Sequence, residues 1–154
     1  MGLTWSNSTP PPQAAENVLV CGADNEARAT AMVALTKHLA EAGVTVFVFT
    51  DEPTRYLGLT PGPSDHNVRQ HTKLDAEDRR EILDATGSTA VVVDPVLRNG
   101  GDALRQLIHE DANVAVVVAV TGCPTRSRRA EYTRVWLDGS WLGNDDKGWF
   151  GSLW

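Results

Sequence analysis

Short apolar runs alternate with amphipathic stretches along most of this chain. The apolar runs are Val18–Cys21, Val44–Phe49, Ala90–Val93 and Asn113–Val120, and each has the length and composition of a strand buried on both faces. Amphipathic stretches of helical length stand between them. The pattern predicts the order β-α-β-loop-α-β-α-β, an alternation that is typical of a mostly parallel sheet.

The rest of the chain is arranged around the first strand, loop and helix of this pattern. Met32, Leu35 and Leu39 recur at helical spacing, so a helix from about residue 25 to 42 can bury one stripe against the sheet. Gly22 ends the preceding strand, and Gly43 stands where a left-handed helix cap belongs. The loop between the first strand and this helix is the usual ligand site in such folds.

Polar residues mark the ends of two later helices. Asp75 is predicted to cap a helix that ends at Gly87, and Asp102 to cap a short helix through Ile108. The prolines and glycines between residues 53 and 73 predict a long irregular loop, which in a compact domain is often functional.

The fold class predicted is α/β, with three α/β/α layers around a mostly parallel sheet. Residues 1–15 form a Pro-rich arm, 16–135 the α/β domain and 136–154 a Trp-rich extension. Residues 121–135 are basic and are expected to be largely helical.

The composition of the chain narrows the range of functions to expect. The 154 residues carry a formal net charge of −6, whereas nucleic acids and anionic membranes usually select a basic face. No apolar run reaches the length of a membrane span and no signal peptide is evident, so a cytoplasmic protein is expected. The four histidines lack metal-ligand spacing, and no metal site is predicted. Cys21 and Cys123 follow neighbouring strands, either as buried free thiols or as a redox pair.

The segment GADNEARAT, residues 22–30, stands where a phosphate-binding loop would stand. In that motif glycines let backbone amides surround phosphate, a lysine reaches the outer phosphates, and a hydroxyl holds magnesium. Gly22 occupies the first glycine position and Ala27 the second, Arg28 the lysine position, and Ala29 the hydroxyl position, with Thr30 next.

Three further segments stand in a matching order: TDEPTR (50–55), NVRQ (67–70) and DPVLRNGGDALRQLI (94–108). With the loop, they resemble the adenylylsulfate kinases, P-loop kinases that phosphorylate the 3′-hydroxyl of adenosine 5′-phosphosulfate. The resemblance covers about Val18 to Val120 and implies a P-loop kinase-like fold. It implies that an active enzyme would use ATP and Mg²⁺, with Asp51, Glu52 and Asp94 as catalytic carboxylates and Arg55, Asn67, Arg69 and Arg98 binding the anionic substrate.

The departures from the motif fall on the residues that do the chemistry. Arginine is a planar fork rather than a point charge, and Ala27 and Ala29 lack the flexibility and the hydroxyl that the motif uses. Asp24 and Glu26 add carboxylates where phosphate would bind, although Asp24 or Asn25 also suits a helix N-cap. We therefore expect no cofactor, and a degenerate, non-catalytic pseudo-kinase that serves as a binding or assembly subunit. An active small-molecule kinase using Arg28 and Thr30 is the alternative.

Two partner surfaces are predicted. Arg55, Arg69 and Arg98 are expected to face one cleft beside the long loop and bind a small anion, unless they are ordinary surface or ion-paired arginines. Four tryptophans, Trp136, Trp141, Trp149 and Trp154, are expected to contact another protein chain or a second copy. The alternative is that they pack back on the domain.

Overall fold

A computed structural model of the chain describes residues 16–59, 67–96, 101–111, 113–122 and 124–142. The elements in chain order are β1 (Asn17–Cys21), α1 (Asn25–Glu41), β2 (Thr45–Thr50), the 3-10 helix η1 (Pro53–Arg55), β3 (Val68–Arg69), α3 (Ala76–Asp84), β4 (Thr89–Asp94), α4 (Asp102–His109), β5 (Val114–Ala119), α5 (Arg126–Arg129), β6 (Arg134–Leu137) and β7 (Ser140–Trp141).

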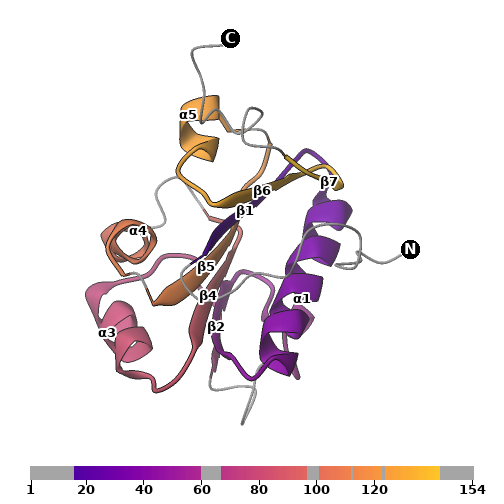
Figure 1. Cartoon of the computed structure of the whole chain (residues 1–154). Coiled ribbons are helices and arrows are strands. Elements are labelled where there is room, and N and C mark those ends of the chain that lie inside the picture. The colour runs from indigo at the N-terminus through magenta and orange to yellow at the C-terminus, as the bar shows by residue number, and fades with distance from the viewer. Residues whose placement is uncertain (1–15, 60–66, 97–100, 112, 123, 143–154) are drawn as a thin grey trace.

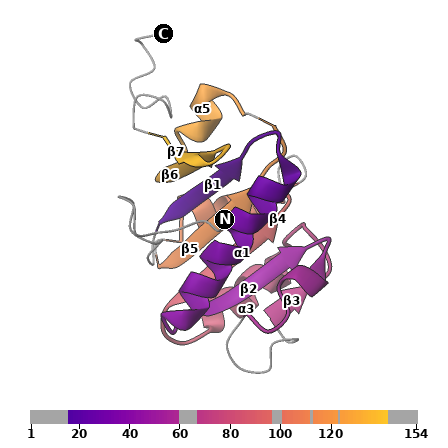
Figure 2. The same ribbon diagram turned by 90° about the vertical axis from the view of Figure 1, so that its right-hand side faces the viewer.

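These strands form one seven-stranded sheet in the order β3-β2-β4-β5-β1-β6-β7. Neighbours run parallel except β6 and β7, which are antiparallel. Helix α1 covers one face of the sheet, and α3 and α4 cover the other (Figure 1). Seen from the α1 side, this helix lies in front of the sheet (Figure 2). The predicted α/β class with a mostly parallel sheet is confirmed.

The central strands are buried on both faces, as their unbroken apolar sequences predict. Every residue of β4 and β5 is buried. Along β5, Val116 and Val118 pack with the α3 and α4 side chains, whereas Ala115 and Val117 pack with those of α1. Each fully buried valine stabilises the fold by roughly 1.5 kcal/mol or more. The sheet is therefore the centre of two cores, one on each face.

The helix ends follow the local sequence closely. The Asp24 carboxylate accepts hydrogen bonds from the amides of Glu26 and Ala27, as expected of an N-cap. Asp75 forms a capping box with Asp78 at the start of α3. At α4 the prediction is wrong by one residue. Gly101 is the N-cap there, with φ 100°, and a Cβ on it would lie 2.6 Å from the carbonyl oxygen of Leu74.

The largest correction concerns the C-terminal part of the domain. The helix expected over residues 121–135 is limited to α5, and the chain then adds β6 and β7 to the sheet. The domain boundary predicted after residue 135 is therefore wrong, because the sheet extends to Trp141. The turn between the two strands is Asp138-Gly139 with φ 47° and 99°, the positive values that a two-residue hairpin turn requires.

A smaller correction concerns the segment after β2, which was expected to be an irregular loop. It contains η1, and Val68 and Arg69 form the edge strand β3 beside Val48 and Phe49 of β2. Residues 60–66 of that loop lie outside the described residues.

Candidate functional site

A small charged cavity lies at the carboxyl edge of the parallel strands. Its volume is about 270 Å³, and its lining comes from the start of α1, the segment from the end of β2 through η1, the end of β4 and the β5–α5 connection. The lining residues are Asn25, Arg28, Ala29, Asp51, Glu52, Arg55, Asp94, Pro95 and Thr121. In open α/β sheets, ligands bind outside the carboxyl ends of the strands. We call this space the carboxyl-edge cavity.

The loop at one end of the cavity differs from a phosphate-binding loop. Helix α1 already begins at Asn25, so only residues 22 to 24 connect it to β1. The first free amides of the helix, those of Glu26 and Ala27, donate to the Asp24 carboxylate. The Arg28 amide donates to the Asp24 carbonyl oxygen within the helix. The amides that would hold phosphate in the motif therefore already have acceptors here.

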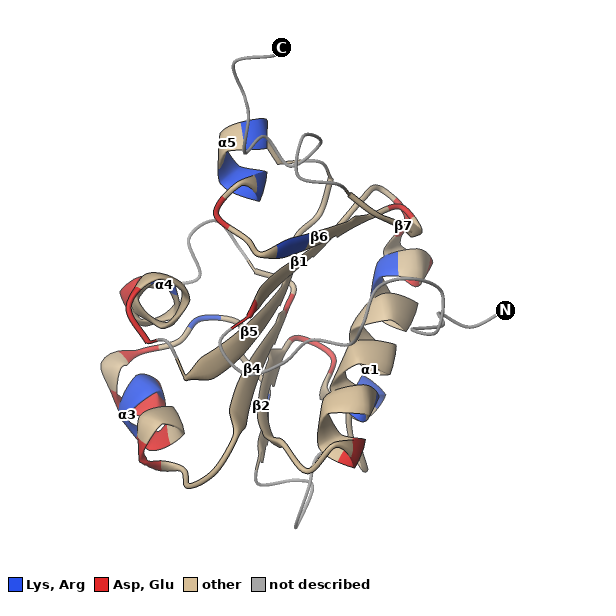
Figure 3. Ribbon diagram, viewed as in Figure 1, with Lys and Arg blue, Asp and Glu red and all other residues tan. Residues whose placement is uncertain are grey.

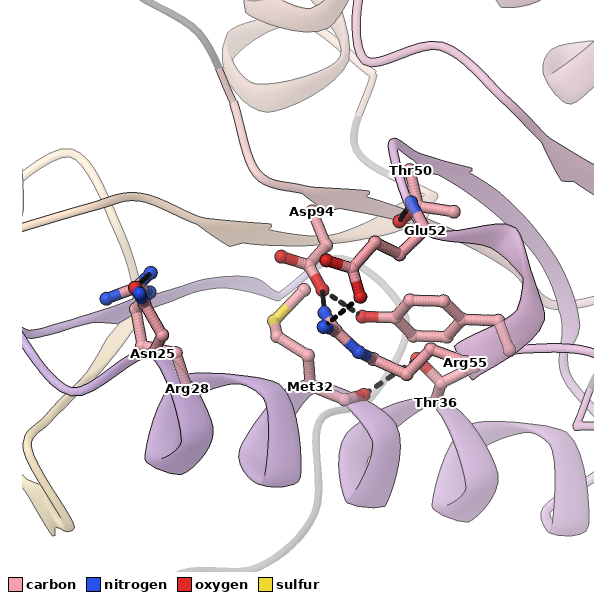
Figure 4. Close-up of polar contacts among 9 residues, drawn as sticks. Asn25, Arg28, Met32, Thr36, Thr50, Glu52, Arg55 and Asp94 are labelled. Carbon is pink, nitrogen blue, oxygen red and sulfur yellow. Dashed lines mark hydrogen bonds and ion pairs between the residues drawn. The ribbon is translucent and has the colours of Figure 1, made fainter.

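The side chain of Arg28 closes this loop. One guanidinium nitrogen donates to the Gly22 carbonyl oxygen and another to Asn25 Oδ1, and the residue is only 8% exposed. Figure 4 shows Arg28 and Asn25 together at the helix start, apart from the acidic residues around Asp94. The positive charge in the lysine position thus binds the loop itself.

The side chain of Asp138, in the β6–β7 turn, lies directly against Gly22. A Cβ built on Gly22 would lie 2.0 Å from Asp138 Oδ1, and the Asp138 amide donates to the Cys21 carbonyl oxygen at 3.3 Å. The first glycine of the loop therefore makes room for a carboxylate. Sequence reasoning missed Asp138 as a neighbour of this loop, although its Asp-Gly dipeptide is a hairpin signal.

The hydroxyl position of the motif is occupied by Ala29, which has no metal ligand to offer. Ala29 lines the cavity, whereas Thr30 is exposed on α1 and does not line it. The hypothesis that Thr30 takes over the metal-holding role stays a prediction, with Thr30 outside this cavity. Among the described residues, no group of three or more His, Cys, Asp or Glu side chains could hold a metal ion.

A buried cluster around Asp94 forms the other end of the cavity. The Tyr56 hydroxyl donates to Asp94 Oδ2, and Arg55 lies 3.2 Å from the same oxygen while its second nitrogen binds Glu52. Glu52, Arg55 and Asp94 converge in Figure 4. Burial raises the pKa of Asp94 above its usual value, although the contacts with Tyr56 and Arg55 lower it. Burial, and then the charge of Asp94, raises the pKa of Tyr56, so its hydroxyl stays protonated.

Tyr56 is a second neighbour of the candidate site that the sequence did not reveal. It lies in the Pro- and Gly-rich segment after β2, yet it is 0% exposed and packs in the core under α1. No local pattern distinguishes it from the neighbouring loop residues, because its role depends on meeting β4 in the folded chain.

The charge of the cavity is predominantly acidic. Its lining holds two guanidinium groups, on Arg28 and Arg55, against the three carboxyl groups of Asp51, Glu52 and Asp94. Asp51 is exposed, and no described residue forms an ion pair or hydrogen bond with its carboxylate. Both arginines already have acceptors, so the cavity has no excess of positive charge to offer a phosphate.

The three predicted anion-binding arginines do not share a cleft. Arg69 lies on the opposite face of the sheet from Arg55, with its guanidinium 5.7 Å from the ring centre of Phe47. It binds Asp78 at 3.3 Å and Glu81 at 2.7 Å on α3. The prediction of a common space is therefore wrong for Arg55 and Arg69, which are ion-paired instead. Asn67 does not line the cavity, and Arg98 lies outside the described residues.

Two of the four predicted partner-binding tryptophans belong to the domain itself. Trp136, in β6, is 3% exposed and packs in the α1 core. Trp141 is half-buried against that core, and the guanidinium of Arg134 lies 5.4 Å from its ring centre. The prediction that these two dock on another chain is corrected accordingly. Trp149 and Trp154 lie outside the described residues, as does Cys123, so its distance from the buried Cys21 is not defined.

Fold and site together define an α/β domain with a small acidic cavity at the carboxyl edge of its sheet. Searches with this chain against models of protein families, curated proteins and solved structures found no match. No described helix has both the length and the apolar character needed to cross a membrane.

Proposed function

We propose that this protein is a non-catalytic binding domain, a degenerate relative of the adenylylsulfate kinases that does not transfer phosphate. The observation that carries the proposal is the closed β1–α1 loop. Asp24 takes the first helix amides, Arg28 takes the Gly22 carbonyl oxygen and Asn25, and Asp138 lies beside Gly22.

Electrostatics supports the absence of tight ATP binding. A carboxylate about 4 Å from a phosphate costs on the order of 4 kcal/mol at an effective dielectric constant of 20. That penalty lowers affinity by about a thousandfold, since about 1.4 kcal/mol corresponds to a factor of ten. Asp24 and Asp138 both stand at the loop, and Arg28 would have to leave its two acceptors to offset them.

The carboxyl-edge cavity suits a different kind of ligand. Its acidic lining and its volume of about 270 Å³ favour a small group that donates hydrogen bonds or carries positive charge. The exposed Asp51 carboxylate is one acceptor available to such a group. In this proposal the site binds without catalysis, and the protein acts as a binding or assembly subunit.

Calorimetry of ATP binding, with and without Mg²⁺, tests this function. We expect no binding at micromolar ATP for the unaltered chain. The triple variant Ala27→Gly, Arg28→Lys and Ala29→Ser restores the motif residues, and adding Asp138→Gly and Asp24→Gly removes the two carboxylates. If the loop residues are the cause, ATP affinity rises stepwise along this series.

Micromolar ATP binding by the unaltered chain, abolished by Arg28→Ala, would overturn the proposal. It would favour an active kinase with Asp51, Glu52 or Asp94 in the catalytic roles. A phosphate-transfer assay with adenylylsulfate then distinguishes that enzyme from a nucleotide-binding protein without kinase activity.

A further inference from the structure

A second cavity lies on the other face of the sheet and shares no lining residue with the carboxyl-edge cavity. It lies between α4, α5 and the segment that leads into β6, and its volume is about 250 Å³. Its lining residues are Val96, Leu104, Arg105, Ile108, His109, Arg128, Glu131 and Tyr132. We call it the α4–α5 cavity.

The lining combines an apolar part with a basic part. Leu104 and Ile108 come from one side of α4 and belong to the α3–α4 core or pack against it. Two guanidinium groups, on Arg105 and Arg128, also border the space, and arginines colour most of α5 in Figure 3. An apolar surface beside positive charge fits a molecule with an apolar body and an anionic group.

The acidic residue of the lining offsets only part of this charge, because one carboxylate stands against two guanidinium groups. Glu131 Oε1 lies 3.0 Å from Nε2 of His109, so its carboxylate faces a partner within the lining. Arg105 reaches Asp102 only at 4.0 Å, and the two side chains are 60% and 95% exposed. So exposed a pair contributes little and is easily given up for a better anion.

Tyr132 supplies a polar group inside the cavity lining. The residue is 5% exposed, and no described residue forms a hydrogen bond with its hydroxyl. Burial raises the pKa of Tyr132 to about 12, while the positive charge of Arg128, which lines the same cavity, lowers it. A bound anion would supply an acceptor for this hydroxyl.

We propose that the α4–α5 cavity binds a small organic anion, with an aromatic or branched body on Leu104 and Ile108 and its carboxylate or phosphate near Arg105, Arg128 and Tyr132. The size agrees, because an apolar cavity of about 150 Å³ is known to hold benzene. The space here, about 250 Å³, has room for a ring with one charged substituent.

The test uses phenylacetate and phenyl phosphate as probes, with phenylacetamide as the uncharged control, in calorimetry of the full chain. For ligands of this size we expect a dissociation constant on the order of millimolar. The amide should bind at least about tenfold more weakly, since it lacks the charge-assisted hydrogen bonds. Comparing the two anions shows whether the site prefers carboxylate or phosphate.

Two variants locate the binding. Arg105→Gln and Tyr132→Phe should each weaken the preferred anion about three- to tenfold. The matched control is Arg80→Gln, an exposed arginine on α3 outside both cavities, which should leave the affinity unchanged. Amide NMR shifts on titration should centre on Ile108 and Glu131. If Tyr132→Phe does not fold, the affinity of Arg105→Gln tests the site by itself. The Arg105 side chain is exposed, so we expect this variant to fold.

Three results would each overturn the proposal: no binding of either anion at about 10 mM, ten times the expected constant; equal binding of phenylacetamide; or unchanged affinity in both variants. Since neither variant touches the carboxyl-edge cavity, these outcomes are independent of the ATP experiment.

Discussion

Burial and hydrogen bonding shift the pKa of Asp94 in opposite directions. It ends a fully buried strand, so desolvation disfavours its charged form, while Tyr56 and Arg55 stabilise that form. The net effect is a raised pKa. A strand-end aspartate that would order magnesium in an active kinase is therefore held here by two side chains of the same domain.

The raised pKa makes a prediction about stability. Because the folded state holds the Asp94 proton more tightly than the unfolded chain, this group favours folding below the ordinary carboxyl value of 3.8. The contribution is lost as pH rises through the raised pKa. The Asp94→Asn variant has no carboxyl group at this position. Its melting temperature, relative to that of the unaltered protein, should therefore rise as pH increases across this window.

The Tyr56→Phe variant provides the matched control for that measurement. The Tyr56 hydroxyl lowers the pKa of Asp94, so its removal should move the pH window upward. A difference between Asp94→Asn and the unaltered protein that stays constant with pH would show that Asp94 titrates alike in the folded and unfolded states.

At the scale of elements, the β1–α1 loop and the β6–β7 hairpin determine each other's shape. Gly22 has φ 134° and lies against the Asp138 side chain, while Gly22 and Gly122 form a backbone bridge that joins this loop to the end of β5. The glycine that resembles the start of a phosphate loop is thus required by contacts within the domain.

Substituting this glycine tests the coupling of the two elements. Gly22→Ala should destabilise the protein by roughly 1–3 kcal/mol, because a side chain is strained at this φ and meets the Asp138 carboxylate. Chemical denaturation measures the loss. In the double variant with Asp138→Gly, the part due to the clash should be recovered and the part due to backbone strain retained. Full additivity of the two substitutions would contradict the contact.

On the scale of the whole molecule, the sheet ends later than the chain pattern indicates. Strand β6 pairs with β1 and carries Trp136 into the core, so the described domain extends to Leu142. The proposal of a partner-binding extension therefore concerns residues 143–154, which contain Trp149 and Trp154.

Two truncations separate the domain from this extension. Removing residues 143–154 should leave the melting temperature unchanged and, if the extension binds a partner or a second copy, abolish assembly measured by light scattering. Removing residues 138–154 also deletes β7 and the half-buried Trp141, and it should lower the melting temperature. An equal drop in melting temperature for both truncations would place residues 143–154 in the fold.

The sequence by itself determined the features that depend on near neighbours in the chain. The unbroken apolar runs of β4 and β5 predict strands buried on both faces, and the cap at Asp24 and the turn at Gly43 follow from local backbone chemistry. The α/β class follows from the alternation of these elements. Strand β6 escaped prediction because a four-residue strand with one buried tryptophan has too little periodicity to stand out from a loop.

Only the tertiary structure decided what the candidate site contains. Arg55 and Arg69 look alike in the sequence, yet the sheet separates them and gives each its own carboxylates. Tyr56 reaches Asp94, and Asp138 reaches Gly22, across 38 and 116 positions of the chain. The charge of a cavity, and the acceptors that its arginines find, depend on residues far apart in the chain. Local sequence patterns do not encode such contacts.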